Sequence, residues 1–421
     1  MKTDPQVSEP PVISHLSMVR QVGAGVGARL LAGGTISGTD KSLVVLYAGK
    51  VSLCSSSGCY LVYDASDNSL AAIPQLPDRH TFRGLGGWPA ILSLSEGSYV
   101  VAELVEAKSR FPNAELFLWR SLGTPNQEGQ WIRRAVRLPP QEFSRGHRFR
   151  IDMAFTFTEF RVCWVDLFKG VLVCNLMESP EPTFTFVPSP IGCSIELERR
   201  VIPGPQQFRT MGCVRGTIKF VALDGFNERH SPQENIMIRT WTLSPDLKEW
   251  AEGTPLRVGD LWASESFLQS GLPRLGLTYP VISFDEPDVV YFVLNEIDRV
   301  DAFNRFGDVS GVRLVCKALY VLGLDTVQQK VLCHTKVIPD NLSPIFPGLL
   351  ASEFSAHLQR SKDHQGELEA SEPGGNQKEM KHASEEGGSE KQMKHASGEG
   401  GSEKQMKHAN EEGGSRKRMK R

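Results

Sequence analysis

The segment that comes closest to a cofactor-binding motif is the glycine-rich stretch at residues 23–28, GAGVGA. It matches the G-x-G-x-x-A pattern of a dinucleotide-binding loop, which also needs a following helix, a second parallel strand and an acid about 20 positions further on. Here residues 29–34 are too short for that helix, and the apolar run at 43–47 is followed by Ala48 and Gly49. We therefore interpret the stretch as a glycine loop and predict no cofactor.

Side chains suited to acid–base, nucleophilic or metal chemistry are scattered along the chain. The ten histidines form no H-x-H or H-E-x-x-H pattern, and the sequence has no C-x-x-C pair, G-x-S-x-G elbow or Walker loop. Single acids at Asp64, Asp166 and Asp325 follow apolar runs, where a carboxylate ordinarily caps a turn. We predict no catalytic residue and no metal site, and we favour a protein without enzymatic activity.

The cysteines point to free thiols. Eight cysteines in 421 residues are too few for a disulfide scaffold. Cys163 and Cys174 lie in apolar runs on either side of a turn at residues 168–170, and one register of that hairpin would let them face each other. Because a thiol in an apolar strand behaves as a small hydrophobic group, we expect both to be free, with a bridge as the minor alternative.

The charge balance argues against a core that binds nucleic acid or membranes. The formal net charge is −2, and no apolar stretch approaches the roughly 18–20 residues of a membrane helix. Residues 1–21 contain Asp4, Glu9 and three prolines before any apolar run, unlike a signal or transit peptide. We expect a soluble protein of the cytoplasm, the nucleus or both, with unidentified protein partners and no membrane association.

Strand–turn–strand phrases recur along the first 340 residues. An example is the apolar run at 162–165, the turn at 166–170 and the apolar run at 171–174. The hairpins group into five sets, near residues 42–73, 88–137, 149–187, 207–250 and 279–337. Residues 13–36 are expected to add a sixth set or a closing strand. Because a blade takes roughly 40–50 residues, we predict an all-β, propeller-like array of four-stranded antiparallel sheets with about five to six blades.

Composition also sets the domain boundaries. Residues 1–12 are predicted to be a disordered, proline-rich leader, and residues 13–345 the propeller-like domain, with Trp164 and Trp241 buried in its strands. Residues 346–360 are expected to contain a short helix. Residues 361–421 are polar and repeat a 13-residue unit, ASEEGGSEKQMKH. Such a segment cannot bury enough apolar surface to offset its ordering entropy, so we predict a disordered tail.

The end of this tail is a candidate targeting signal. Five of the last six residues are basic, namely Arg416, Lys417, Arg418, Lys420 and Arg421. Nuclear import receptors recognise short runs of Lys and Arg, and such runs also attract nucleic acid. We predict a nuclear-import signal here and weak nucleic-acid binding by the tail. A basic end that only aids solubility is the alternative.

The segment at residues 162–174, VCWVDLFKGVLVC, resembles a signature of the plant family known as domain of unknown function 1618, which is expanded in grasses. The segments that follow it in the order typical of the family are residues 184–190, 214–221 and 240–243. The resemblance is close over residues 160–250, and it departs from the family at Asn175, where an acid is usual. It implies a plant protein with a propeller-like β-fold and no established activity, and it supplies no site residues.

Three classes of function are compatible with these observations. We favour a non-enzymatic protein-interaction module, because propellers expose variable loops around a rigid scaffold. The first alternative is an enzyme with its site in the central funnel, which requires acids or histidines from several blades to converge there. The second is a nuclear, nucleic-acid-associated protein that acts through the basic tail and binds in a salt-sensitive way.

Overall fold

The fold is known from a computed structural model. The residues it describes are 2–6, 8–19, 34–48, 59–74, 76, 88–106, 113–121, 129–139, 149–158, 160–178, 182–193, 204–226, 231–304, 307–338 and 349–353. The chain divides into two compact units, residues 1–371 and residues 372–421. The second unit lies outside the described residues, so the expected tail and its basic end do too.

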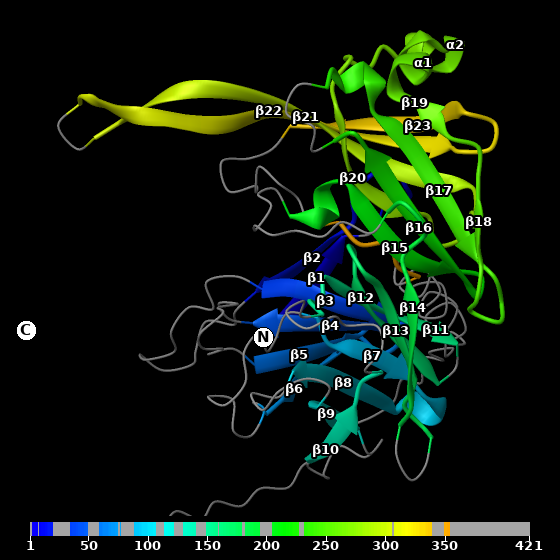
Figure 1. The fold of residues 1–421 in the computed structure, drawn as a ribbon. Helices are drawn as coiled ribbons and strands as arrows, with labels where there is room; N and C mark the ends of the chain where they lie inside the picture. The colour runs from blue at the N-terminus through cyan, green and yellow to red at the C-terminus, as the bar shows by residue number, and fades with distance from the viewer. Residues whose placement is uncertain are drawn as a thin grey trace, which may run out of the picture. The chain divides into compact units, whose positions relative to one another are not determined.

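The described part of the first unit is an all-β, five-bladed propeller of four-stranded antiparallel sheets (Figure 1). The first two blades consist of β3 (Gly34–Asp40), β4 (Leu43–Ala48), β5 (Cys59–Asp64) and β6 (Ser69–Ile73), then β7 (Ala90–Ser93), β8 (Tyr99–Glu106), β9 (Asn113–Arg120) and β10 (Trp131–Arg137). The third consists of β11 (Met153–Thr158), β12 (Arg161–Asp166), β13 (Gly170–Asn175) and β14 (Phe184–Pro188).

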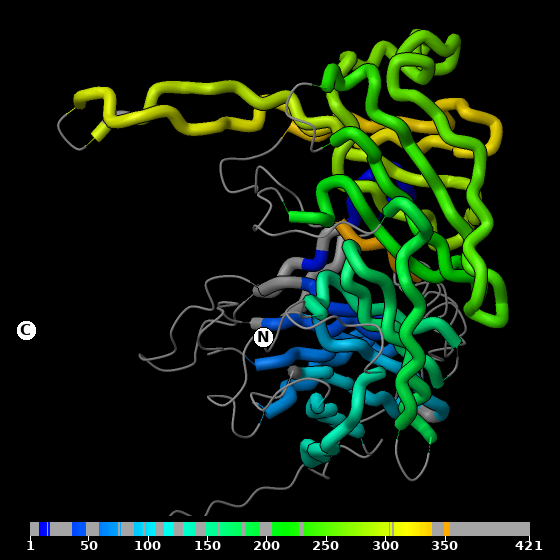
Figure 2. Tube along the Cα trace, viewed as in Figure 1, coloured from blue at the N-terminus to red at the C-terminus, as the bar shows by residue number. Residues whose placement is uncertain are grey.

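Figure 2 colours the last two blades from green to orange along the chain. Blade 4 consists of β15 (Arg209–Val214), β16 (Thr217–Asp224), β17 (Met237–Leu243) and β18 (Trp250–Glu252), with β19 (Leu256–Arg257) also paired to β17. Blade 5 consists of β20 (Leu277–Ile282), β21 (Val289–Phe303), β22 (Val309–Asp325) and β23 (Lys330–Val337). Each blade corresponds to one of the five predicted hairpin sets.

The hydrophobic core lies between consecutive blades. Pairs of buried residues that share one cluster and come from consecutive blades are Val45 with Phe117, Leu116 with Trp164, Val173 with Phe220, and Val221 with Phe292. Trp164 is 0% exposed and Trp241 3% exposed, so both are buried strand residues as predicted. Each fully buried side chain of this size contributes about 1.5–3 kcal/mol through apolar burial.

The first and last blades are joined by the N-terminal segment. Ile13 packs on the blade 5 cluster that contains Val293, and Leu16, three residues later, packs on the blade 1 cluster that contains Val44. Leu349, which follows the last strand, packs on the same blade 5 cluster as Ile13. Closure therefore uses side chains from both ends of the domain and no strand shared between blades.

The structure differs from the sequence expectations at three places. Residues 2–6, expected in a disordered leader, form β1 (Lys2–Gln6), because they pair antiparallel with β2 (His15–Val19). That pairing makes a separate two-stranded sheet, so the described part of residues 13–36 supplies no sixth blade, and residues 34–36 belong instead to β3, the first strand of blade 1. Residues 349–353, expected within a short helix, are not helical, and the rest of 346–360 lies outside the described residues.

Two short helices were not expected from the sequence. They are α1 (Val258–Ala263) and α2 (Glu265–Ser270), between blades 4 and 5. Leu261 and Phe267 insert into the cluster that these blades share. Ser264 caps α2, since its side chain accepts the Phe267 N–H. None of the helices in the described ranges has the length and apolar character needed to cross a membrane.

Candidate functional site

The first strand of every blade faces the centre of the propeller. These inner strands are β3, β7, β11, β15 and β20, and consecutive ones pack against one another. They enclose a cavity of about 340 Å³, which residues 349–353 also line. Its volume lies at the lower end of the range of small-molecule pockets, roughly 300–1,000 Å³.

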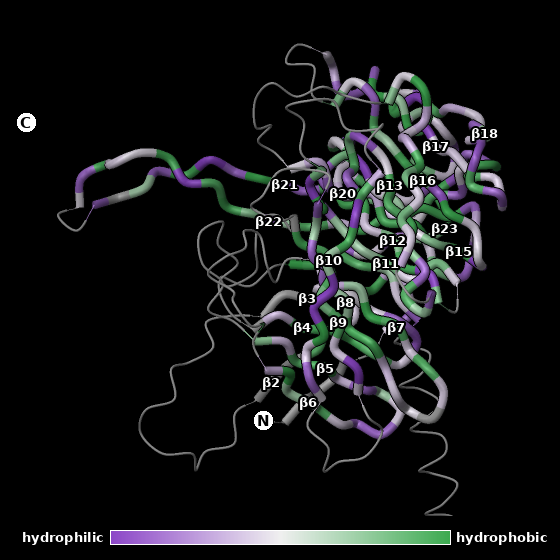
Figure 3. Tube along the Cα trace, turned by 60° about the horizontal axis from the view of Figure 1, so that its bottom comes forward, coloured by the Kyte–Doolittle hydropathy of each residue, from purple (hydrophilic) through white to green (hydrophobic). Residues whose placement is uncertain are grey.

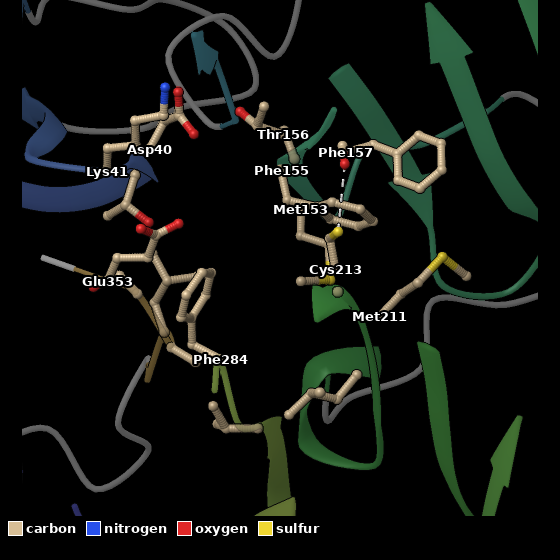
Figure 4. A pocket seen from close by; sticks show the side chains of 18 of the residues that line it. Asp40, Lys41, Met153, Phe155, Thr156, Phe157, Met211, Cys213, Phe284 and Glu353 are labelled. Atoms are coloured by element: carbon tan, nitrogen blue, oxygen red, sulfur yellow. Dashed lines mark hydrogen bonds between the residues drawn. The ribbon is translucent and has the colours of Figure 1, made fainter. Parts of the chain in front are cut away.

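One wall of the cavity is apolar. It is built by Met153 and Phe155 of β11 and by Met211 and Cys213 of β15. Phe284, beyond the end of β20, lies on the opposite side, beside Glu353. Figure 4 shows these side chains around an open space, with the Cys213 thiol turned toward the Phe157 carbonyl oxygen. The Sγ–O distance is 3.5 Å. This wall suits an apolar or aromatic group.

The opposite wall carries two carboxylates, Asp40 at the end of β3 and Glu353 from the segment after blade 5 (Figure 4). Asp40 Oδ2 accepts the Ser93 N–H at 2.6 Å. The pKa of Asp40 is raised to about 6, mainly by burial; the negative charge of Glu353 adds to this rise, whereas the Ser93 N–H and the positive charge of Lys41 oppose it. A carboxylate whose pKa lies near neutrality can exchange a proton at physiological pH.

Few of the described lining residues carry an ionisable side chain. Asp40 and Glu353 are the acids among the described lining residues, and no histidine lines the cavity there. The acids come from one blade and one terminal segment, whereas the enzyme alternative requires convergence from several blades. In the described ranges no three His, Cys, Asp or Glu side chains are grouped as metal ligands. Sequence inspection missed Asp40, because a single acid at the end of a polar strand gives no signal.

The acids at the hairpin turns are turn caps, as expected. Asp64 Oδ1 accepts the Ser66 N–H at 2.9 Å, and Asp166 Oδ1 accepts the Phe168 N–H at 3.0 Å. Asp325 Oδ1 accepts the Val327 N–H at 2.9 Å. In each case the carboxylate binds the amide two residues further on, as in an Asx turn. None of the three lines the central cavity.

The two cysteines of the third blade are both free. In the β12–β13 register, Val162 pairs with Cys174 and Cys163 pairs with Val173. Cys163 and Cys174 therefore belong to neighbouring cross-strand pairs, and their side chains point to opposite faces of the sheet. Burial raises the pKa of Cys163 well above its ordinary value and that of Cys174 to about 12, so both thiols stay protonated.

A long β-hairpin extends from blade 5. β20 pairs with β21 only as far as Leu294, and β23 pairs with β22 only as far as Leu319. Residues 295–303 and 309–318 therefore continue as a two-stranded ribbon, here called the arm, which extends away from its blade in Figures 1 and 3. Val309, Val312 and Leu314 of the arm are 61%, 63% and 42% exposed.

The predicted site residues at the end of the tail, Arg416, Lys417, Arg418, Lys420 and Arg421, lie outside the described residues. None of the described residues that form the cavity or the arm was predicted as a site residue. The arm itself was missed because its strands are polar enough to resemble a loop between two apolar runs.

Comparison with known proteins identifies one family and no close relative. Residues 164–291 match the family model described as a protein of unknown function, DUF1618, from Trp164 in β12 to Tyr291 in β21. No curated protein matches the chain.

Among solved structures, an ulvan lyase of a new polysaccharide lyase family is similar with 10% identity and a TM-score of 0.32, over 74% of this chain and 70% of that chain. An endo-arabinase from Bacteroides thetaiotaomicron is similar with 11% identity and a TM-score of 0.26, over 61% and 81%. At these scores the likeness carries no argument about activity.

Proposed function

Because residues 164–291 are a DUF1618 domain carried on a five-bladed β-propeller, we propose that the chain is a non-enzymatic protein-interaction module. The observation that supports this proposal is the arm at residues 295–303 and 309–318. It combines exposed apolar side chains with main-chain hydrogen-bonding groups at unpaired strand edges, and partner proteins use both features.

The energetics of a free ribbon favour a partner for the arm. A two-stranded ribbon is only marginally stable in water, because neither face is covered and few apolar contacts offset its ordering entropy. Val312 and Leu314 alternate with Arg313 along β22, and their cross-strand neighbours are Asp301 and Arg299. Val312 and Leu314 therefore share one face, which has an apolar row beside a charged row. A partner that covers this face would bury the apolar row and stabilise the ribbon.

The test compares two pairs of exposed apolar side chains. In the arm variant, Val312→Ser and Leu314→Ser remove the apolar row. In the matched control, Val327→Ser and Ile338→Ser remove side chains of blade 5 that are 67% and 77% exposed. Each full-length chain is fused to a proximity-labelling enzyme in cells. The proposal expects the arm variant alone to lose a defined set of labelled proteins, and identical sets for both variants would contradict it.

The two alternative functions have less support. Among its described lining residues the central cavity supplies the Asp40 and Glu353 carboxylates, with Lys41 and Cys213, and no histidine, so the enzyme alternative depends on these few side chains. The nucleic-acid alternative depends on residues 416–421, which lie outside the described residues. Nuclear or cytoplasmic location stays a prediction of the basic end.

A further inference from the structure

The outer edge of the arm on the β21 side offers unpaired main-chain groups. β20 ends its pairing at Leu277, opposite Leu294, so residues 295–303 of β21 have β22 on one side and no described strand on the other. The strand there is regular. Both register shifts in the arm place the extra residue on β22, at Lys317 and at Ser310. A regular, unpaired edge is suited to accept another strand.

The β22 edge is less suited to pairing. Its two bulges disturb the spacing of the main-chain groups, and Gly311 has a φ of +157°. Its ionised side chains between residues 309 and 317 are Arg313 and Lys317, both basic. Bulges and basic side chains are common devices that keep an edge strand from pairing. The β21 edge has no bulge between residues 295 and 303, and its charged side chains include both acids and a base.

The charges along β21 of one copy are complementary to those along β21 of a second copy that runs antiparallel to it. In an antiparallel pairing with a two-fold axis at Val300, each Val300 lies opposite its copy, and Arg299 lies opposite Asp301 of the second copy. The symmetry forms this pair twice, since each copy supplies one Arg299 and one Asp301. With the axis at Arg299, Asp298 would lie opposite Val300, and with the axis at Asp301 two aspartates would meet. Of these three registers, the charges favour the one with its axis at Val300.

The side chains are available for these pairs. Arg299 and Asp301 are both exposed, and neither forms an ion pair with another described residue. Asp298, by contrast, is already bound to Lys317, with 2.8 Å between Nζ and Oδ2. Arg299 and Asp301 lie on the face that also carries Leu314 and Val312. Pairing would therefore widen this face to four strands, with apolar side chains flanking the charged pairs.

We propose that the arm's partner is a second copy of this chain, joined by antiparallel pairing of the two β21 edges around Val300. This inference rests on the proposed function, since both use the arm, and it names the partner. The result is an isologous dimer whose centre is a four-stranded sheet, in the strand order β22, β21, β21 and β22.

Sedimentation velocity of the full-length chain over a range of concentrations tests the pairing. The wild-type chain is expected to show a concentration-dependent monomer–dimer equilibrium. Arg299→Glu places two acids opposite each other at both symmetric positions, and Asp301→Arg places two bases there. Each variant alone should raise the dimer dissociation constant at least about tenfold, because like charges directly across a ladder repel. Lys248→Glu, an exposed charge reversal on blade 4, should leave the dissociation constant unchanged.

A mixture of the two single variants gives the decisive comparison. In the mixed dimer, the introduced glutamate meets the introduced arginine, and the remaining Asp301 meets the remaining Arg299, so association should return to the wild-type level. A wild-type chain that stays monomeric, or a mixture that associates no better than the single variants, overturns the pairing. If self-association is absent while the serine variant of the arm still loses labelled proteins, only the self-pairing is wrong and the interaction module stands.

Discussion

The carboxylates of Asp152 and Asp166 bind consecutive amides of one turn. Asp152 Oδ2 accepts the Leu167 N–H at 3.1 Å, and Asp166 Oδ1 accepts the Phe168 N–H at 3.0 Å. Arg150 ties the two acids together, since its guanidinium lies 2.8 Å from Asp152 Oδ1 and its main-chain N–H donates to Asp166 Oδ2. The acid of the WVDL segment is thus part of a buried scaffold for the β12–β13 turn.

This scaffold gives a pH-dependent stability. The pKa of Asp152 is raised from 3.8 to about 7, mainly by burial; the positive charge of Arg150 opposes this rise and the negative charge of Asp166 adds to it. The native state then holds a proton that the unfolded state has released, so this group's contribution to stability falls as the pH rises from about 4 to about 7. Asp152→Asn removes the titration, and its melting temperature relative to wild type should rise over this interval.

Asp246→Asn is the control for that titration. In the wild-type chain the pKa of Asp246 is lowered because the Ser244 hydroxyl donates a hydrogen bond to its carboxylate. The stability that Asp246 contributes is therefore lost only at pH values below the ordinary aspartate pKa. Melting curves from pH 4 to pH 7 should show a constant offset for this control. A constant offset for Asp152→Asn as well would mean that Asp152 is not held protonated.

Trp164 should be the most sensitive position of the third blade. Its ring is fully buried, 6.0 Å from the Phe184 ring, in the cluster shared by blades 2 and 3. Trp164→Ala should cost about 3–5 kcal/mol of unfolding free energy in urea titrations, through lost burial and the cavity left behind. Trp164→Phe should cost less, because it keeps an aromatic ring and removes an indole N–H that has no hydrogen-bond partner among the described residues. An unchanged midpoint for the alanine variant would contradict the burial.

The contribution of N-terminal side chains to closure of the propeller can be measured by the same urea titrations. Ile13→Ala and Leu16→Ala should each lower the unfolding free energy by about 1–2 kcal/mol, since each removes a partly buried contact with blade 5 or blade 1. Val12→Ala is the control, because Val12 is largely exposed. Equal stability of all three variants would show that residues 13–16 do not join the blades.

The basic end is tested on the full-length chain fused to a reporter too large to diffuse through nuclear pores. One fusion keeps all residues, and the other lacks the last six, 416–421. We expect the first to concentrate in the nucleus relative to the second, because import receptors bind exposed basic runs. The same distribution for both fusions would leave the basic end without an import role.

Much of the fold could be predicted because its hairpins are local. Apolar runs bounded by Gly, Pro and Asp place strand ends to within a few residues, and buried positions such as Trp164 lie in those runs. The position of each hairpin within its blade was harder to predict. Asp64 and Asp325 lie between the third and fourth strands of their blades, whereas Asp166 lies between the second and third strands of its blade.

The sites could not be predicted for physical reasons. β3 borders the central cavity and carries Gly38 and Asp40, so it lacks the apolar run of a core strand. Between residues 295 and 303 the arm carries the charged residues Glu296, Asp298, Arg299 and Asp301, and this composition is typical of a loop. The meeting of Asp40 with Glu353 depends on closure of the whole propeller, which no local pattern encodes.

The central claim is that the arm contacts protein. The most direct measurement replaces Val312 with a photo-crosslinking residue in the full-length chain, with the same replacement at Val327 as the control. Both positions are exposed on blade 5, and only Val312 belongs to the arm. The account predicts a discrete protein adduct after illumination at position 312, including the chain's own dimer, and none at 327. The same adducts from both positions, or none from either, would contradict it.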